Sequence, residues 1–377
     1  MKILVLNCGS SSIKYKLFEN EKPLTAGLIE KIGEKDSPIQ NYAQGMERLV
    51  RQLLESGTLE SLSEIDAVGH RVVHGGELSE PSLIDESVIE KIKNYCELAP
   101  LHNPVNLKGI LEMQQKLPDV PHVAVFDTAF HQTMPAYAFL YGLPYEYYEK
   151  EGIRRYGFHG TSHAYVAEMA AKLLNKPLSE LNLITCHLGA GCSMAAVKNG
   201  KVIDTSMGLT PLEGLIMGTR SGDIDAGVVI YFANKKQMTF SEIDEVLNKR
   251  SGLAGISGVG KDIRVIIKEY KRGSKRSRLA IEMFCYRLKK YIGSYAAALD
   301  KVDAIVFTAG IGEHRPLVRS LSTDIKILGI EIDENKNTQM VGRDGIISSD
   351  NSKIKVLVIG TDEEKKIAIE TMRLVNY

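Results

Sequence analysis

The sequence predicts an α/β protein built from two similar halves. In each half, an apolar strand enters a turn rich in glycine and serine and leaves it as a second strand. The first copy has its strand at 2–6 and its turn at 7–12, and the second has them at 183–188 and 189–193. The Asn-Gly pair at 199–200 then predicts a two-residue hairpin turn into a third strand. Recurrence of one strand-turn-strand pattern indicates internal duplication.

A second, weaker repeat supports the same conclusion. Residues 65–76 and residues 302–313 each begin as an apolar strand and end in a glycine-rich polar loop. Glycine lets the backbone approach a ligand closely, and the N–H groups and hydroxyls around it suit phosphate oxygens. An ordinary serine-rich hairpin would explain the first copy alone, but not its recurrence. The two halves therefore predict one nucleotide cleft between two domains.

The composition excludes several classes of protein. With 377 residues, the chain is long enough for two domains with a sizeable core. Lys and Arg together number 47, as do Asp and Glu, so no overall charge favours nucleic acid or an anionic membrane. No apolar run is long enough to span a bilayer, and the N-terminus enters a strand without the basic leader of a signal peptide.

The cysteines point to a reducing compartment. They are odd in number and show neither Cys-x-x-Cys nor zinc-ligand spacing. The five positions are Cys8, Cys96, Cys186, Cys192 and Cys285. We expect reduced, mostly buried thiols and hence a cytoplasmic protein.

Periodicity and chain breakers predict the remaining elements. A polar connector is expected at 27–43, a Tyr- and Pro-rich link between the domains at 135–156, and a long glycine-dense loop at 208–225. Long loops of that kind are more often functional than idle. The expected helices lie at 45–55, 86–98, 105–117, 163–175, 226–234, 241–249, 278–299 and at the C-terminus. The expected strands lie at 65–69, 123–126, 304–308 and 354–359, with a meander at 182–204.

Charged residues in these loops suggest phosphoryl chemistry. Asp127, Asp223 and Glu363 offer carboxylates to a hard cation such as Mg²⁺. Arg71 and Arg220 lie in glycine loops, where a guanidinium can clamp a transferring phosphoryl group. The chain has no Walker A motif and no protein-kinase signature. The remaining interpretation is that two duplicated domains bind ATP between them, as in actin.

In these features the chain closely resembles the acetokinase family, within the acetate and sugar kinase/Hsp70/actin superfamily. The resemblance covers essentially the whole chain and is specific because many motifs occur in order. The matching motifs lie at 7–14, 69–76, 99–104, 126–131, 155–163, 207–214, 218–225 and 310–313. The resemblance implies two duplicated ribonuclease H-like (actin-like ATPase) domains with a cleft between them. Their expected limits are 1–131 plus 365–377 for the N-terminal domain and 132–364 for the C-terminal, nucleotide-binding domain.

The family also implies an activity and its partners. The reaction is reversible transfer of the γ-phosphoryl group of ATP to acetate, giving acetyl phosphate and ADP by direct in-line transfer. It requires Mg²⁺ or Mn²⁺. A cytoplasmic homodimer is expected, without nucleic acid or membrane partners.

Catalytic and metal-binding roles carry over by position. Asn7 and Glu363 would help to hold Mg²⁺. Arg71 would bind the acetate carboxylate, and Arg220 with His159 would stabilise the transition state. Asp127 is the family's acid/base candidate. A carboxylate nucleophile has no proton to lose, so we expect Asp127 to position the metal or an arginine instead.

Binding residues carry over in the same way. The wall around the acetate methyl group would be formed by Val73, Leu101, Phe158 and Pro211. The nucleotide would be bound by Ser10, Ser12, Lys14, His187, Leu188, Gly189, Ala190, Gly191, Asp262, Ile263, Arg264, Gly310, Ile311, Gly312, Glu313 and His314. Three positions depart from the family, which usually has Asn at 190, Asn at 314 and Pro at 226, where this chain has Ala190, His314 and Ala226. The first two make the nucleotide preference less certain than the chemistry.

Structural roles compete with some of these assignments. Asp223 could equally cap the helix that follows it, Asp262 could cap the next helix, and Glu313 could only brace its loop. We also expect the histidines at 70, 102, 122 and 131 to be hydrogen-bonded structural residues rather than catalytic ones.

Three alternative functions stay open at this stage. The nearest is the same chemistry on propionate or butyrate, which the wall at Val73 and Pro211 would decide. A non-enzymatic ATP-binding module would not need Arg71, Arg220 or His159. A glycosidase or metal hydrolase using Asp127 and Glu363 would not need the glycine- and serine-rich phosphate turns.

Overall fold

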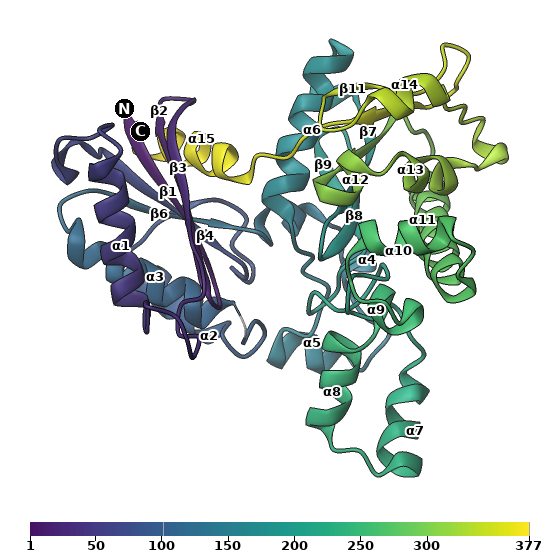
Figure 1. Ribbon diagram of the computed structural model, residues 1–377, viewed down its shortest axis with the longest axis horizontal. Coiled ribbons are helices and arrows are strands. Elements are labelled where there is room, and N and C mark those ends of the chain that lie inside the picture. The colour runs from purple at the N-terminus through teal and green to yellow at the C-terminus, as the bar shows by residue number, and fades with distance from the viewer. Residues whose placement is uncertain (101, 377) are drawn as a thin grey trace. The chain divides into compact units, whose positions relative to one another are not determined.

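The computed structural model describes residues 1–100 and 102–376, which form two compact units (Figure 1). The first unit comprises Met1–Gln132, Phe158–Tyr165 and the chain from Asp362 onward. The second unit comprises Thr133–Gly157 and Val166–Thr361.

The sequence had placed 158–165 in the C-terminal domain, but this segment belongs to the first unit. The Gly160 N–H donates a hydrogen bond to the Asp127 carbonyl (2.9 Å), and the His131 ring bonds the Phe158 carbonyl (3.0 Å). Residues 362–364, also predicted on the C-terminal side, likewise fall in the first unit.

The sheet of the first unit has six strands in the order β3-β2-β1-β4-β6-β5. Its first three strands form an antiparallel meander, β4 and β6 run parallel to β1, and β5 is an antiparallel edge. The strands are β1 (Lys2–Gly9), β2 (Ser12–Glu19), β3 (Lys22–Ile29), β4 (Ala67–Val72), β5 (Ser82–Leu83) and β6 (His122–Phe126).

The second sheet repeats this plan. Its order, β11-β12-β10-β7-β8-β9, read in reverse, gives a meander, two parallel strands and an antiparallel edge. Asn199 (φ 52°) and Gly200 (φ 80°) form the predicted left-handed turn. The strands are β7 (Asn182–Leu188), β8 (Cys192–Lys198), β9 (Lys201–Thr205), β10 (Ala304–Thr308), β11 (Gly345–Ile346) and β12 (Lys355–Val358). The predicted duplication is confirmed.

Helices cover both faces of the first sheet. Successive residues of β1 point to opposite faces, so Leu4 and Leu6 join the core beneath α1 and α3, whereas Ile3 and Val5 pack against α15. The helices of this unit are α1 (Tyr42–Glu55), α2 (Glu86–Asn94), α3 (Asn103–Lys116) and α15 (Glu363–Val375), with the start of α6 (Gly160–Leu174).

In the second unit, the long helix α11 packs along β7 and β8, and α9, α10 and α13 contact it. The helices are α4 (Ala136–Phe139), α5 (Tyr145–Glu151), α7 (Ala226–Lys236), α8 (Phe240–Lys249), α9 (Gly252–Ser257), α10 (Ile263–Lys271), α11 (Lys275–Leu299), α12 (Ala309–His314), α13 (Pro316–Thr323) and α14 (Glu334–Gln339). Short 3₁₀ turns lie at Leu62–Glu64, Ala129–Thr133, Leu178–Glu180 and Lys326–Leu328.

Three local expectations were wrong. The connector expected from residue 27 begins later, because β3 pairs with β2 as far as Ile29. The glycine-rich segment at 310–314 is not a loop, because α12 begins directly after β10. Asp223 does not cap α7, because the side chain of Asp225 accepts the capping bond from the Gly227 N–H.

Within the described residues, no helix is both long enough and apolar enough to cross a membrane.

Candidate active site

A paired arginine lies at the carboxyl edge of the first sheet. Arg71 is on β4 and Asp127 directly follows the neighbouring parallel strand β6, which brings the two side chains together. Arg71 Nη2 donates to Asp127 Oδ2 at 2.6 Å, and Arg71 Nε contacts both carboxylate oxygens. Arg71 Nη1 also donates to Asn7 Oδ1 (3.1 Å) on β1. Three strand ends thus hold one guanidinium.

The Asp127 carboxylate is buried, with 1% of its side chain exposed, so its charge depends on these partners. Thr161 Oγ1 donates a further hydrogen bond to Asp127 Oδ1 (3.2 Å). Burial alone would lower the pKa of Arg71, but the charges of Asp127 and Glu363 outweigh it and raise that pKa above its ordinary value. Arg71 is therefore permanently charged and rigidly held.

Acidic residues at the start of α15 complete this cluster. Glu363 Oε2 lies 3.8 Å from Arg71 Nε. Burial raises the pKa of Glu363; Arg71 opposes this shift and Asp127 adds to it. The next residue, Glu364, pairs instead with Lys14 Nζ at 2.8 Å. Lys14, predicted to reach phosphates, is thus tied to α15 while remaining half exposed.

The donors in this cluster fit Mg²⁺. Asn7, Asp127 and Glu363 offer only hard oxygens, and the raised pKa of Glu363 shows that its negative charge is poorly compensated. Among the described residues, no three His, Cys, Asp or Glu side chains form a metal site of their own. Such a partial donor set suits Mg²⁺, which commonly takes its other ligands from water and substrate phosphates. Asp223 has partners of its own in the second unit, where it pairs with Arg287 and accepts a hydrogen bond from Tyr291.

His159 and Gly160 have unusual backbone features next to Asp127. His159 adopts a left-handed conformation (φ 58°), which is costly for a residue with a side chain. A Cβ added at Gly160 would lie 2.1 Å from the Asp127 carbonyl oxygen. The segment is therefore pressed against the end of β6, and glycine is required at 160.

Two predicted wall residues of the acid pocket, Val73 and Phe158, are buried in the first unit, 6% and 2% exposed. His74, the residue after Val73, contacts Phe158: its ring lies edge-on to the Phe158 ring, with the centroids 5.7 Å apart. Leu101 lies outside the described residues, and Pro211 belongs to the second unit, where its carbonyl accepts from Arg220 Nη1 (3.0 Å).

Sequence reasoning missed two asparagines that support this wall. Asn106 accepts from the Val73 N–H and donates to the Cys8 carbonyl, which joins the ends of β4 and β1. Asn103 accepts from the His74 N–H and donates to the His74 carbonyl. Both are buried amides on α3. The prolines and the Asn of the 99–104 motif predict where a helix begins, but they do not predict that amides on that helix support the wall.

The second unit contains a pocket of about 790 Å³ at the glycine-rich turns. The predicted residues that line it are Gly189, Ala190, Gly191, Arg220, Asp262, Ile263, Arg264, Gly310, Ile311 and His314. Four further lining residues, Gly218, Thr219, Lys261 and Arg315, were not predicted. Gly218 and Thr219 lie in the 218–225 motif, so their place in the pocket could have been predicted from the sequence. Lys261 and Arg315 lie in none of the matching motifs.

Other predicted nucleotide residues do not line this pocket. His187 and Leu188 are buried at the end of β7, and Glu313, on α12, accepts a hydrogen bond from the Thr361 N–H. Gly312 packs against the backbone of Phe307. Ser10, Ser12 and Lys14 belong to the first unit. Asp262 has both roles considered for it, because it lines the pocket and also caps α10.

Arg220 contrasts with Arg71. It lines the pocket, and no ion pair among the described residues includes it. Its Nη1 donates only to the Pro211 carbonyl and, at 3.6 Å, to Met217 Sδ. Burial lowers the pKa of Arg220, as expected for a desolvated cation without an acidic partner. An anionic ligand would supply the missing negative charge.

The comparisons with known proteins agree with this arrangement. The sequence model of the Acetokinase family matches residues 2–369. The chain belongs to the acetokinase family. An acetate kinase from Caldanaerobacter subterraneus subsp. tengcongensis is 52% identical over all of this chain and 99% of its own length. One from Thermoanaerobacter pseudethanolicus shows the same identity and coverage.

Solved structures show the same relationship. Porphyromonas gingivalis acetate kinase superposes with a TM-score of 0.95 at 44% identity, and a Francisella tularensis propionate kinase with 0.93 at 45%; each comparison covers 99% of both chains. Membership of the acetokinase family confirms the predicted fold class and enzyme class, a phosphotransferase that uses ATP and Mg²⁺ and acts on acetate. The binding-module and hydrolase alternatives are thereby set aside.

Proposed function

We propose that this acetokinase transfers the γ-phosphoryl group of ATP to acetate by direct in-line displacement, through the residues described above. An acetate oxygen attacks the γ-phosphorus while the bond to the β,γ-bridging oxygen breaks, giving acetyl phosphate and ADP. The reaction is reversible. The observation that carries this proposal is Arg220, a part-buried cation in a glycine-lined pocket that forms no ion pair among the described residues.

In the first unit, Arg71 would hold the acetate carboxylate. Asp127 fixes the orientation of this guanidinium and needs no proton transfer, because the nucleophile is already ionised. Asn7 and Glu363 would hold Mg²⁺, which when bound neutralises charge on the transferring phosphate. Lys14, half exposed beside Glu364, would reach the nucleotide phosphates.

In the second unit, the pocket residues would hold the nucleotide. Backbone N–H groups of the 189–191 turn and the basic side chains of Lys261 and Arg264 suit its phosphates. Arg220 would stabilise the charge on the metaphosphate-like transition state, and His159 of the first unit would assist it. Ala190 supplies no side-chain contact, so the backbone of the turn would act alone there.

The test of this activity is an acyl-phosphate trap. Hydroxylamine converts acyl phosphates to hydroxamates, so the protein, ATP, Mg²⁺ and acetate should yield acetohydroxamate. Acids of two to four carbons and several nucleotides form the panel. A complete lack of hydroxamate with every acid would refute the proposal.

Acetate rather than propionate is proposed as the preferred acid, because Val73 and Phe158 are packed tightly in the first unit. We predict that Val73→Ala raises the propionate-to-acetate ratio of kcat/KM, since one methylene is worth on the order of 1–3 kcal/mol of discrimination. Val72→Ala is the matched control, because Val72 is a buried neighbour outside the proposed wall. An unchanged ratio would remove Val73 from the wall.

We further propose a cytoplasmic homodimer. The five cysteines are all free thiols, as in a reducing compartment. Large apolar side chains are exposed on α7 and α8, including Ile230 (61%), Tyr231 (53%) and Phe240 (79%), which a second copy could cover. Sedimentation of the wild type and of Phe240→Glu tests this: a dimer that dissociates in the variant supports it, and a monomeric wild type contradicts it.

A further inference from the structure

Asp223 was a candidate for metal binding or helix capping, but Asp225 caps α7 and the Asp223 carboxylate pairs with Arg287 and Tyr291. The backbone and side chain of Asp223 also close a loop. The Gly214 N–H donates to Asp223 Oδ1 (2.7 Å), and the Asp223 N–H donates to the Gly214 carbonyl (3.0 Å). The loop from 214 to 223, which carries Arg220, is therefore joined at its base by two hydrogen bonds.

Helix α11 clamps this base. Arg287 Nη1 donates to the Gly214 carbonyl (2.8 Å) and lies 3.0 Å from Asp223 Oδ2. Arg287 Nη2 donates to the Asp223 carbonyl (3.3 Å). One helical turn further on, Tyr291 Oη donates to Asp223 Oδ2 (2.9 Å). The spacing of four residues places both side chains on one face of the helix.

The neck of the loop tolerates little movement. Gly222 has a φ of 67°, and a Cβ there would lie 2.4 Å from the Leu215 carbonyl oxygen. On the other side of the loop, the N–H groups of Leu253 and Ala254 on α9 bond the carbonyls of Met217 and Gly218. The backbone that carries Arg220 is thus held from both α9 and α11.

The same contacts also keep the Asp223 carboxylate from pairing with Arg220. Asp223 is only three residues from Arg220 and could neutralise it. Arg287 and Tyr291 occupy the Asp223 carboxylate instead, so that Arg220 keeps an uncompensated charge toward the pocket. Loop closure and charge separation come from the same three residues.

We propose that Asp223, Arg287 and Tyr291 are positioning residues that hold the Arg220 guanidinium for phosphoryl transfer. This rests on the proposed role of Arg220. Because they act through Arg220, removing them should lower kcat while leaving KM for acetate and ATP within about twofold. None of the three lines the nucleotide pocket.

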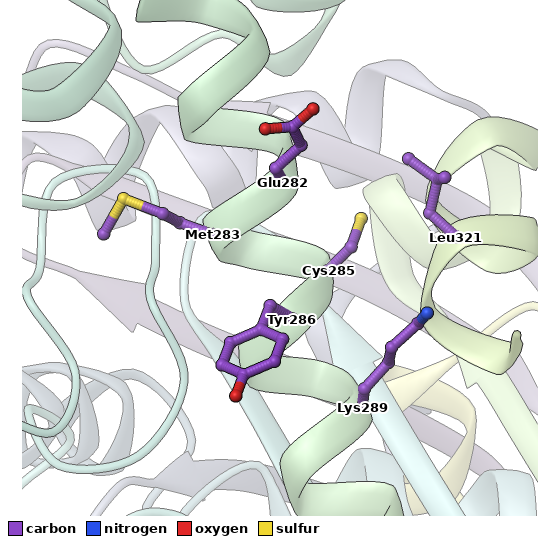
Figure 2. Close-up of a pocket in the computed structure, with 6 residues that line it drawn as sticks. All are labelled: Glu282, Met283, Cys285, Tyr286, Lys289 and Leu321. Carbon is purple, nitrogen blue, oxygen red and sulfur yellow. The ribbon is translucent and has the colours of Figure 1, made fainter. Parts of the chain in front are cut away.

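The first test removes one hydroxyl group. Tyr291→Phe should lower kcat about tenfold, the scale of one hydrogen bond to a charged group. Tyr286→Phe is the matched control, because Tyr286 lies on the same helix but lines a separate groove of about 390 Å³ with Cys285 and Leu321 (Figure 2). The control should leave kcat unchanged. Equal kcat values in the two variants, or a loss of activity expressed only in KM, would overturn the proposal.

The second test is a double-mutant cycle. Asp223→Ala should lower kcat about 100-fold in the wild type but have almost no effect in the Arg220→Ala background, because nothing remains to be positioned. Asp223→Asn, which keeps an acceptor, should recover part of the loss. Thermal unfolding of each variant identifies any that fail to fold. If Asp223→Ala is one of them, Tyr291→Phe takes its place and is measured with and without Arg220→Ala.

The outcomes separate the two proposals. If Arg220→Ala itself retains full kcat, the proposed role of Arg220 fails and the positioning role fails with it. If Arg220→Ala strongly lowers kcat but leaves it measurable, and Asp223→Ala or Tyr291→Phe costs the same factor in both backgrounds, only the positioning role is overturned.

Discussion

The two units hold their key arginines in opposite ways. In the first unit, Arg71 is paired with Asp127 and bonded to Asn7, and its charge is balanced within the protein. In the second, Arg220 is desolvated and has no acidic partner among the described residues. The first guanidinium is held in place by its partners, whereas the second has no charged partner among the described residues. The proposed roles follow this difference: Arg71 would orient a substrate, and Arg220 would stabilise negative charge.

The largest expected effect tests the second arginine. Arg220→Ala should lower kcat by roughly 10³-fold or more, the scale for losing an arginine that neutralises a phosphoryl transition state. Because no carboxylate depends on Arg220, the variant should unfold at nearly the wild-type temperature. Steady-state kinetics with thermal unfolding measure both. A small kinetic effect would place Arg220 outside the reaction.

Arg71→Ala should show the reverse pattern. It leaves the buried Asp127 carboxylate unpaired, which typically costs about 3–5 kcal/mol of unfolding free energy. If the variant folds, KM for acetate should rise more than kcat falls. Denaturant unfolding and kinetics are the measurements, with Arg71→Ala/Asp127→Asn as the matched control that should recover stability. Equal, small effects of Arg71→Ala and Arg220→Ala would abolish the contrast between the units.

The raised pKa of Glu363 makes stability depend on pH. Its folded-state pKa lies above the ordinary 4.5, so the folded protein binds a proton more tightly than the unfolded chain. Stability associated with this proton is present below pH 4.5 and is lost as the pH rises through the folded pKa. Glu363→Gln should therefore be more stable than the wild type at pH 7, and the difference should shrink toward pH 4.5. Urea unfolding across this range checks the sign; a wild type that is the more stable at pH 7 would contradict it.

The smallest effect concerns the turn at 189–191. Ala190 is exposed, and the hydrogen bond that its backbone carbonyl accepts from the Gly218 N–H does not depend on its side chain. Ala190→Asn should change kcat/KM for ATP by about tenfold at most, because a neutral hydrogen bond is worth roughly 0.5–1.5 kcal/mol. A change of several orders of magnitude in kcat would show that this turn does not bind phosphate through its backbone.

Sequence reasoning succeeded where the determinants are local. Alternating apolar residues, turn dipeptides and glycine-rich strand ends showed the duplication, and the second sheet repeats the order of the first. Most of the pocket in the second unit was also predictable, because its residues lie in short motifs that directly follow strands or precede helices. The exception at 310–314 is instructive: the same glycines begin a helix as readily as a loop, and only the packing after β10 distinguishes the two.

The amino-acid sequence by itself thus determined the strand plan, the duplication and most of the residues that line the pocket of the second unit. The tertiary structure decided which charges are paired. Arg71 meets Asp127 across 56 positions because parallel strands end at one edge, and Asp223 meets Arg287 and Tyr291 because α11 packs beneath its loop. Such partners depend on long-range packing, which local propensity and spacing do not encode. That is why two arginines that look alike in sequence, each near glycines, differ so much in electrostatic environment; Arg71, which the sequence placed in a loop, lies on β4.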